Sequence, residues 1–165
     1  MKGVPSFSIL ETIIAIAILA GALTAALGLL SFTLRNIRTV GNELIAGHLA
    51  AEGIEVLRNL RDENWLKGFA WDAWRSTVSG KCYEVVWNTT QSTLNAGCTN
   101  SALQVDAMGH YCYSCGGAAT LYTRKVEIES LTTPTEVVRV RSTVSWMDPV
   151  GPRNITVEDV LYDWK

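Results

Sequence analysis

An uncharged run of 23 residues near the N-terminus limits what this chain can fold into. The run extends from Thr12 to Leu34 and lies between Glu11 and Arg35. At 1.5 Å rise per residue, a helix of this length is roughly 35 Å long, enough to cross a hydrocarbon core of about 30 Å. Because core helices of soluble proteins are seldom this long and apolar on all sides, the run predicts a membrane-spanning helix.

A cleaved secretory signal peptide is the first alternative interpretation of this run. The apolar region of such a peptide normally covers about 7–15 residues and ends at small residues. Here the run is longer, only Lys2 is basic before it, and an amphipathic pattern follows directly, although Ala20 and Ala22 resemble a cleavage motif. The positive-inside rule gives little help, because Lys2 precedes the run while Arg35 and Arg38 follow it.

From Arg35 to about Asn64 the apolar pattern narrows to one helical face. The expected members of this face are Ile37, Val40, Leu44, Ala51, Ile54, Leu57 and Leu60 or Arg61. No proline occurs between Thr12 and Thr133. We therefore predict one helix of about 55–58 residues, whose first half needs lipid or other helices on every side and whose second half needs one partner.

The rest of the chain has the patterns of a small β domain. A loop is expected over 69–79, followed by strands at Lys81–Trp87, Leu121–Ile128, Val137–Trp146 and Asn154–Tyr162, with a turn at Asp148–Pro152. Apolar and polar residues alternate in these strands, which is typical of a sheet with one buried face. Asn88–Thr120 is polar and glycine-rich, and its length indicates a stapled loop or a further hairpin. We expect an antiparallel meander covered by the amphipathic helix.

Four cysteines fall in this C-terminal part, at Cys82, Cys98, Cys112 and Cys115. An even, clustered set in a small membrane-tethered domain indicates two disulfides formed in an oxidising compartment, with three possible pairings. Cys112-Tyr-Ser-Cys115 has the spacing of a zinc knuckle, but Cys82 and Cys98 are too far apart to supply a second close pair. A redox-active pair normally lies in a strand–helix context, which is lacking here. Disulfides are the prediction, and zinc remains the alternative.

Charge and motifs argue against several classes of function. The formal net charge is -2 and the basic residues are scattered, so no direct nucleic-acid site is evident. No P-loop, glycine-rich nucleotide turn or H-E-x-x-H motif occurs, and we expect no enzyme, cofactor or metal. Trp65, Trp71 and Trp74 cluster where the helix meets the β domain; core packing is favoured for them over an adhesive surface.

The residues that open the uncharged run carry the most information. They are Ser6-Phe7-Ser8-Ile9-Leu10-Glu11-Thr12, after a short, weakly basic leader. A lone carboxylate at the lip of a membrane helix costs up to about 3 kcal/mol if it reaches the bilayer centre, so Glu11 is a functional candidate. The structural alternative is an acid favoured in the first turn by the helix dipole. The combination resembles the class III signal of type IV prepilins and pseudopilins, over residues 1 to about 34.

The resemblance extends to the architecture of the whole chain and implies its organisation. It implies an α+β, pilin-like fold, in which a long N-terminal helix packs on a small antiparallel sheet. The implied segments are a prepilin leader at 1–6, a transmembrane and filament-core helix at 7–34, the amphipathic half of that helix at 35–66, and an extracytoplasmic β head at 67–165 with a cysteine-bearing loop at 82–115.

The resemblance also implies a processing route and a role for Glu11. A prepilin peptidase would cut between Ser6 and Phe7, and the family's methyltransferase would then N-methylate Phe7. Glu11 would become the fifth residue of the mature chain and pair with the amino group of Phe7 in a neighbouring subunit. The chain departs from the family in having Ser6 where glycine is usual; a cut after Gly3 would make Glu11 the eighth residue. It also lacks the family's proline in the span and has Gly28 there.

The expected function is that of a structural subunit of a type IV pilus or similar filament, serving adhesion, motility, DNA uptake or secretion. Its partners would be other pilin-like subunits, the prepilin peptidase and N-methyltransferase, and the inner membrane before assembly. The mature protein would then lie in an extracellular or periplasmic filament. The alternatives are a type II secretion pseudopilin and a non-polymerising, single-pass membrane-anchored binding domain.

Overall fold

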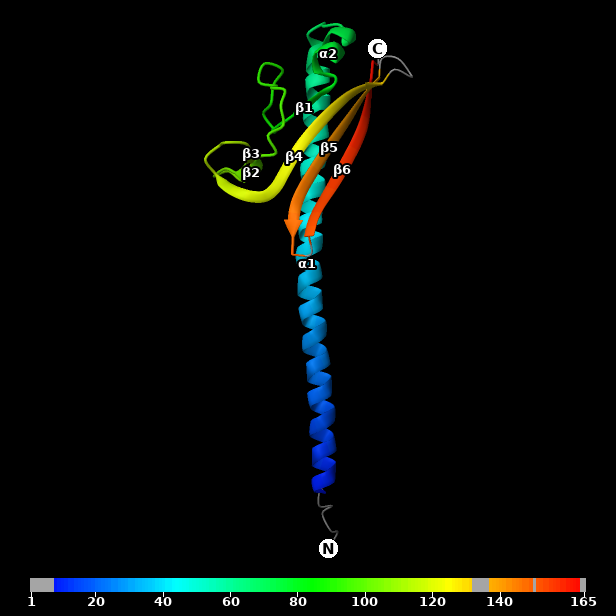
Figure 1. Ribbon diagram of the computed structural model, residues 1–165, viewed down its shortest axis with the longest axis vertical. Coiled ribbons are helices and arrows are strands. Elements are labelled where there is room, and N and C mark those ends of the chain that lie inside the picture. The colour runs from blue at the N-terminus through cyan, green and yellow to red at the C-terminus, as the bar shows by residue number, and fades with distance from the viewer. Residues whose placement is uncertain (1–7, 132–136, 150, 164–165) are drawn as a thin grey trace. The chain divides into compact units, whose positions relative to one another are not determined.

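The computed structural model describes residues 8–131, 137–149 and 151–163 (Figure 1). Its elements are α1 (Ile9–Leu66), α2 (Trp71–Val78), β1 (Lys81–Tyr83), β2 (Ala102–Val105), β3 (Tyr111–Cys112), β4 (Ala118–Leu131), β5 (Val137–Asp148) and β6 (Gly151–Tyr162). The protein is therefore α+β, with a long N-terminal helix and an antiparallel sheet. The chain divides into two units, Met1–Gly41 and Asn42–Lys165.

Helix α1 contains 58 residues and is bounded by local signals at both ends. At its start, the Ser8 hydroxyl accepts a hydrogen bond from the Leu10 N–H at 3.3 Å, which is the usual role of a serine N-cap. At its end, Gly68 has a φ of +75° and donates its N–H to the Trp65 carbonyl at 3.0 Å. Because glycine adopts this left-handed conformation without a Cβ penalty, the helix ends where the sequence places Gly68.

Within the described residues the sheet has six strands, and every strand pair is antiparallel. The order along the main path is β3-β2-β4-β5-β6, and β1 pairs with β4 beside β2. β4, β5 and β6 form the predicted meander, and the last hairpin is tight, with Asp148 opposite Gly151. The first predicted strand was too long: β1 ends at Tyr83, opposite Val126, because β2 occupies the same edge of β4 between Ala118 and Thr123.

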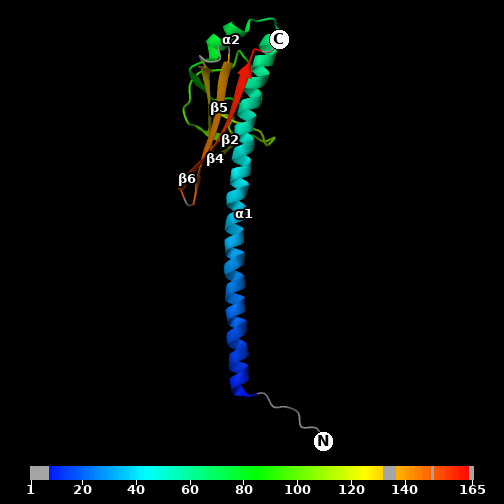
Figure 2. The same ribbon diagram turned by 90° about the vertical axis from the view of Figure 1, so that its right-hand side faces the viewer.

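Residues 42–66 of α1 cover one face of this sheet (Figure 2). The buried residues of α1 are Ala46, Leu49, Ala50, Gly53, Ile54, Val56, Leu57 and Leu60. All but Gly53 share two core clusters with alternating side chains of β4 and β5, including Tyr122, Val126, Ile128, Val138, Val140, Val144 and Trp146. The predicted face was therefore right at Ile54, Leu57 and Leu60 but wrong at Ile37, Val40, Leu44 and Ala51, which are exposed.

At Gly53 the backbone of α1 lies close against the sheet. A Cβ atom built on Gly53 would lie 2.5 Å from Ser142 Oγ and 3.1 Å from Val126 Cγ2. Real Cβ atoms do not come this close to a neighbour, so only glycine fits without movement of the sheet. The helix accepts a propensity cost of about 1 kcal/mol at Gly53 in exchange for this contact. Ion pairs Arg58–Asp159 at 2.7 Å and Arg153–Glu43 at 2.8 Å link α1 to β6.

Residues 71–78 form the short helix α2, where the sequence predicted a loop. An isolated helix of this length is not stable in water, so its local sequence gives a weak signal. Its stability comes from packing, because Trp74 and Val78 are buried in the same core as Leu57 and Val140. Trp71 packs against the edge of that core, with its ring centroid 5.3 Å from that of Trp74.

Candidate functional site

The first turn of α1 contains Glu11, the residue singled out by the sequence. Glu11 is exposed, and its N–H donates to the Ser8 carbonyl at 3.0 Å. It therefore lies three residues after the N-cap, where a carboxylate is favoured by the helix dipole. The predicted processing residues, Ser6 and Phe7, lie outside the described residues. The first turn thus places one carboxylate directly before the uncharged run.

The uncharged residues 12–34 form a helical surface that is apolar on every side. All of them are exposed within the described chain, among them Ile13, Leu19, Leu23, Leu30 and Leu34. The threonine hydroxyls in the run donate to carbonyls of the same helix: Thr12 to Ile9, Thr24 to Ala20 and Gly21, and Thr33 to Leu29 at 2.9 Å. In the described part of the chain, one helix, α1, is long and apolar enough to cross a membrane. These features indicate a membrane anchor.

The glycines of this segment leave open space around the helix. A Cβ atom added at Gly21 or Gly28 would meet nothing within 4 Å. Their backbone conformation is helical, as it is throughout α1. Both positions therefore have room for a neighbouring helix.

The β domain is fastened to α1 by a buried cation, Arg124, that the sequence analysis did not single out. Arg124 as a whole is 1% exposed, and its guanidinium donates to the carbonyl of Leu49 at 2.9 Å and to the carbonyl of Val85. The Glu52 carboxylate lies 3.5 Å from the same group. Arg124 thus joins α1, β4 and the segment after β1. Strict alternation from Tyr122 to Val126 would have placed Arg124 on the buried face, and this was the available signal.

The four cysteines form two disulfides, Cys82–Cys98 and Cys112–Cys115, and none is free. Every cysteine sulfur is therefore in a disulfide, and no thiolate remains for the zinc alternative. Among the described residues, no group of three or more His, Cys, Asp and Glu side chains could hold a metal ion. Disulfides of this kind persist in oxidising compartments, which indicates an extracytoplasmic domain.

Cys82–Cys98 ties a long loop to the sheet. Cys82 lies in β1 opposite Glu127 of β4, and the two cysteines are separated by 16 residues. The Gly97 N–H donates to the Cys82 carbonyl at 2.7 Å beside the bridge. The Glu84 carboxylate then accepts from the Thr99 N–H and hydroxyl, both at 2.8 Å. The loop after β1 is therefore held both covalently and by hydrogen bonds.

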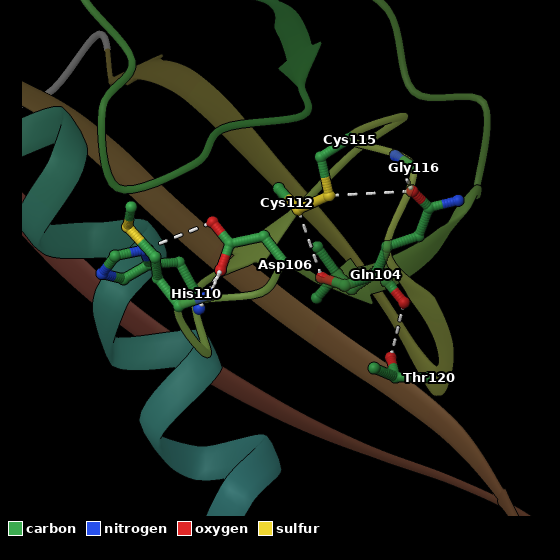
Figure 3. The surroundings of a disulfide bond; sticks show 9 residues. Gln104, Asp106, His110, Cys112, Cys115, Gly116 and Thr120 are labelled. Carbon is green, nitrogen blue, oxygen red and sulfur yellow. Dashed lines mark hydrogen bonds and ion pairs between the residues drawn. A yellow bond between two sulfur atoms is a disulfide. The ribbon is translucent and has the colours of Figure 1, made fainter.

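Cys112–Cys115 closes a much smaller loop at the end of the β2–β3 hairpin (Figure 3). Cys112 is buried in β3, whereas Cys115 is exposed in the loop that follows. The side-chain oxygen of Gln104 accepts from the Gly116 N–H at 3.1 Å and lies 3.7 Å from the Cys115 sulfur. The polar segment between the first and second predicted strands is thus both stapled and folded into a hairpin.

The turn of this hairpin is organised by Asp106. One carboxylate oxygen accepts from the His110 N–H at 2.9 Å and the Met108 N–H at 2.8 Å, and the other lies 3.3 Å from the His110 ring nitrogen. These hydrogen bonds lower the pKa of the Asp106 carboxyl, and the hydrogen bond from the His110 backbone N–H has the largest effect. The His110 ring packs on Trp87 with centroids 4.7 Å apart.

The tryptophans near the end of α1 divide between core and surface. Trp74 is buried and Trp71 partly buried, as core packing requires, but Trp65 is 52% exposed. Phe69 and Tyr162 are also more than half exposed and line a shallow hollow together with these tryptophans. The preference for a core role was therefore right at Trp74 and wrong at Trp65.

Comparison with known proteins gives no family assignment. No family model, curated protein or solved structure matches this chain.

Proposed function

We propose that the chain is a structural subunit of a type IV pilus or pilus-like filament, of the pilin or minor pilin type. The observation that carries this proposal is an uncharged helical segment, exposed on every side, that begins one residue after a lone carboxylate. Such a surface needs lipid or other helices around it. A bilayer supplies lipid and a filament core supplies helices. The same segment can therefore be inserted in the membrane before assembly and packed in the filament core afterwards.

Processing and register are the two chemical features of the proposed assembly. Cleavage between Ser6 and Phe7 removes the leader and leaves an amino group on Phe7, which is then N-methylated. That amino group pairs with Glu11 of a neighbouring subunit inside the apolar core. Two opposite charges leave water at tolerable cost only when they meet each other. A single ion pair among otherwise interchangeable apolar contacts also fixes the axial register of the helices.

The disulfide-bonded β head is proposed to lie outside the inner membrane, first beside it and then on the filament surface. Residues 42–66 of α1 share their hydrophobic core with the sheet, so this part of the helix belongs to the head. This arrangement leaves the cysteine-bearing loops available for contact with other subunits or with a surface. The proposed partners are other pilin-like subunits and the peptidase and methyltransferase that process the N-terminus.

Mass spectrometry of the membrane-extracted and sheared protein tests the processing step. The expected mature protein lacks residues 1–6 and carries one methyl group on Phe7. An intact Met1 on filament-assembled protein would contradict the proposal. A protein that keeps its leader and stays in the membrane fraction after shear would instead be the single-pass anchored domain.

A charge-removing substitution tests the assembly role of Glu11. Glu11→Gln keeps the size and polarity of the side chain but removes its charge, so helix formation and membrane insertion should persist while filament assembly falls at least tenfold. Ser8→Ala is the matched control, because it removes the N-cap but leaves the carboxylate. If Ser8→Ala reduces assembly as much as Glu11→Gln, the carboxylate acts as a helix-end residue and the proposed register role is wrong.

A further inference from the structure

The two disulfides differ in how easily an attacking thiolate can reach their sulfur atoms. Both Cys82 and Cys98 are half-buried, and Cys82 is held in β1 against β4. Cys112 is 9% exposed, but its partner Cys115 is exposed in a loop. Thiol–disulfide exchange requires a thiolate to reach a disulfide sulfur directly. Cys115 is therefore the most accessible point of attack among the four cysteines.

Gln104 provides acceptors for both sulfur atoms of this bridge. Its backbone carbonyl lies 3.4 Å from the Cys112 sulfur, and its side-chain oxygen lies 3.7 Å from the Cys115 sulfur (Figure 3). A disulfide has no hydrogen to donate, so the two sulfur atoms can donate hydrogen bonds to these oxygens only when the bridge is reduced. Two S–H groups would then each find an oxygen already in place, which favours the dithiol form.

The backbone between the two cysteines also favours opening of the bridge. Ser114 has a φ of +52°, a left-handed conformation that residues with a Cβ adopt at some cost. Cys112 itself is paired with Gln104 of β2, and this pairing does not require the disulfide. Because the bridge joins residues only three apart, it restricts the unfolded chain little and its loss removes little stability. The hairpin can therefore outlast the bridge.

We propose that Cys112–Cys115 is a reversible exchange site for a dithiol oxidoreductase, with Cys115 as the attacked sulfur. No helix begins after Cys115, because the next described element is β4, so the pair lacks the setting of a catalytic C-x-x-C motif and is a substrate. This inference does not depend on filament assembly. It requires only that the head meets a dithiol in its compartment.

The exchange proceeds in two balanced steps. A thiolate of the dithiol attacks Cys115 Sγ, a mixed disulfide forms, and Cys112 leaves as a thiolate that takes up a proton. The second thiolate of the reductant then attacks the reductant sulfur that is bonded to Cys115. This closes a disulfide within the reductant and releases Cys115 as a thiolate, which is also protonated. The chain gains two electrons and two protons, and the reductant becomes a disulfide.

Partial reduction of the full chain in detergent tests this proposal. The protein is treated with increasing dithiothreitol, quenched with N-ethylmaleimide, and mapped by peptide mass spectrometry. The expected intermediate carries labels on Cys112 and Cys115 only, forms several-fold faster than reduction of Cys82–Cys98, and keeps the native tryptophan fluorescence. Reduction of Cys82–Cys98 first, simultaneous reduction of both bridges, or loss of the native fluorescence with the first labels would each overturn it.

Two further measurements test the assigned roles of Cys115 and Gln104. A monothiol, reduced glutathione, should form its adduct on Cys115, and an adduct on Cys112 would overturn the assignment of the attacked sulfur. Gln104→Met removes the side-chain acceptor, so half-reduction should need about threefold more dithiothreitol, the factor expected for one weak hydrogen bond. Glu84→Gln, at the other bridge, is the matched control and should leave this value unchanged. An unchanged value for Gln104→Met would refute the acceptor role.

Discussion

The close contact at Gly53 leads to a quantitative prediction about how α1 meets the sheet. Replacing a helical glycine by alanine normally stabilises a protein by about 0.5–1 kcal/mol, because alanine has the better helix propensity. At Gly53 the added Cβ would lie 2.5 Å from Ser142 Oγ and 3.3 Å from Ser142 Cβ. Overpacking of this kind costs about 1–3 kcal/mol. Gly53→Ala should therefore be neutral or destabilising by up to about 2 kcal/mol.

Gly47 provides the matched control on the same helix. A Cβ added at Gly47 meets nothing within 4 Å, so Gly47→Ala should gain the propensity term alone. The propensity term cancels in the difference between the two alanine variants. Their free energies of unfolding should therefore differ by about 1–3 kcal/mol, which is the steric cost by itself.

A substitution at Ser142 tests whether its Oγ atom causes the steric cost of Gly53→Ala. Its hydroxyl is buried and has no hydrogen-bond partner among the described residues, so Ser142→Ala removes an unpaired polar group. In the double variant the 2.5 Å contact disappears, and the two substitutions should couple favourably by about 1 kcal/mol.

The assay is urea unfolding of the full chain in detergent. It is followed by tryptophan fluorescence, because Trp74 and Trp146 are buried in the two cores of the head. Equal effects of alanine at Gly53 and Gly47, or additivity of Gly53→Ala with Ser142→Ala, would refute the inferred packing.

Three further predictions concern the head. Arg124→Met should lower the free energy of unfolding by about 2–4 kcal/mol in the same assay, because it leaves the Val85 carbonyl and the Glu52 carboxylate without their buried donor; a loss below 0.5 kcal/mol would show that Arg124 is not a fastening point. Leu57→Ala should cost about 2–5 kcal/mol, because Leu57 is 0% exposed, and a smaller loss would place it outside the core. For Asp106 the pKa is lowered in the folded state, so its stabilisation is present above the ordinary carboxyl value and is lost as pH falls through the lowered pKa. The difference in thermal midpoint between wild type and Asp106→Asn should therefore shrink below about pH 4, and a pH-independent difference would contradict the assigned hydrogen bonds.

The sequence alone determined the features that depend on neighbours along the chain. The 23 uncharged residues, and the lack of proline between Thr12 and Thr133, determined a long helix with an apolar first half. Helix length and hydropathy depend on residues that are close along the chain. Period-two alternation determined the meander of β4, β5 and β6 and the inward side of Tyr122 and Val126, since a strand turns one face to the core whatever its partner.

Tertiary structure decided the features that depend on which surfaces meet. The apolar residues Ile37, Val40 and Leu44 fit the spacing of one helical face but are exposed, whereas Ala46 and Leu49 are buried where the helix approaches the sheet. The small residues at Ala46, Ala50 and Gly53 allow that approach, and sequence periodicity does not weigh size in this way. The same reason applies to α2, because a helix of eight residues forms only when packing stabilises it. It also applies to the disulfides, because four cysteines allow three pairings and the fold selects one of them.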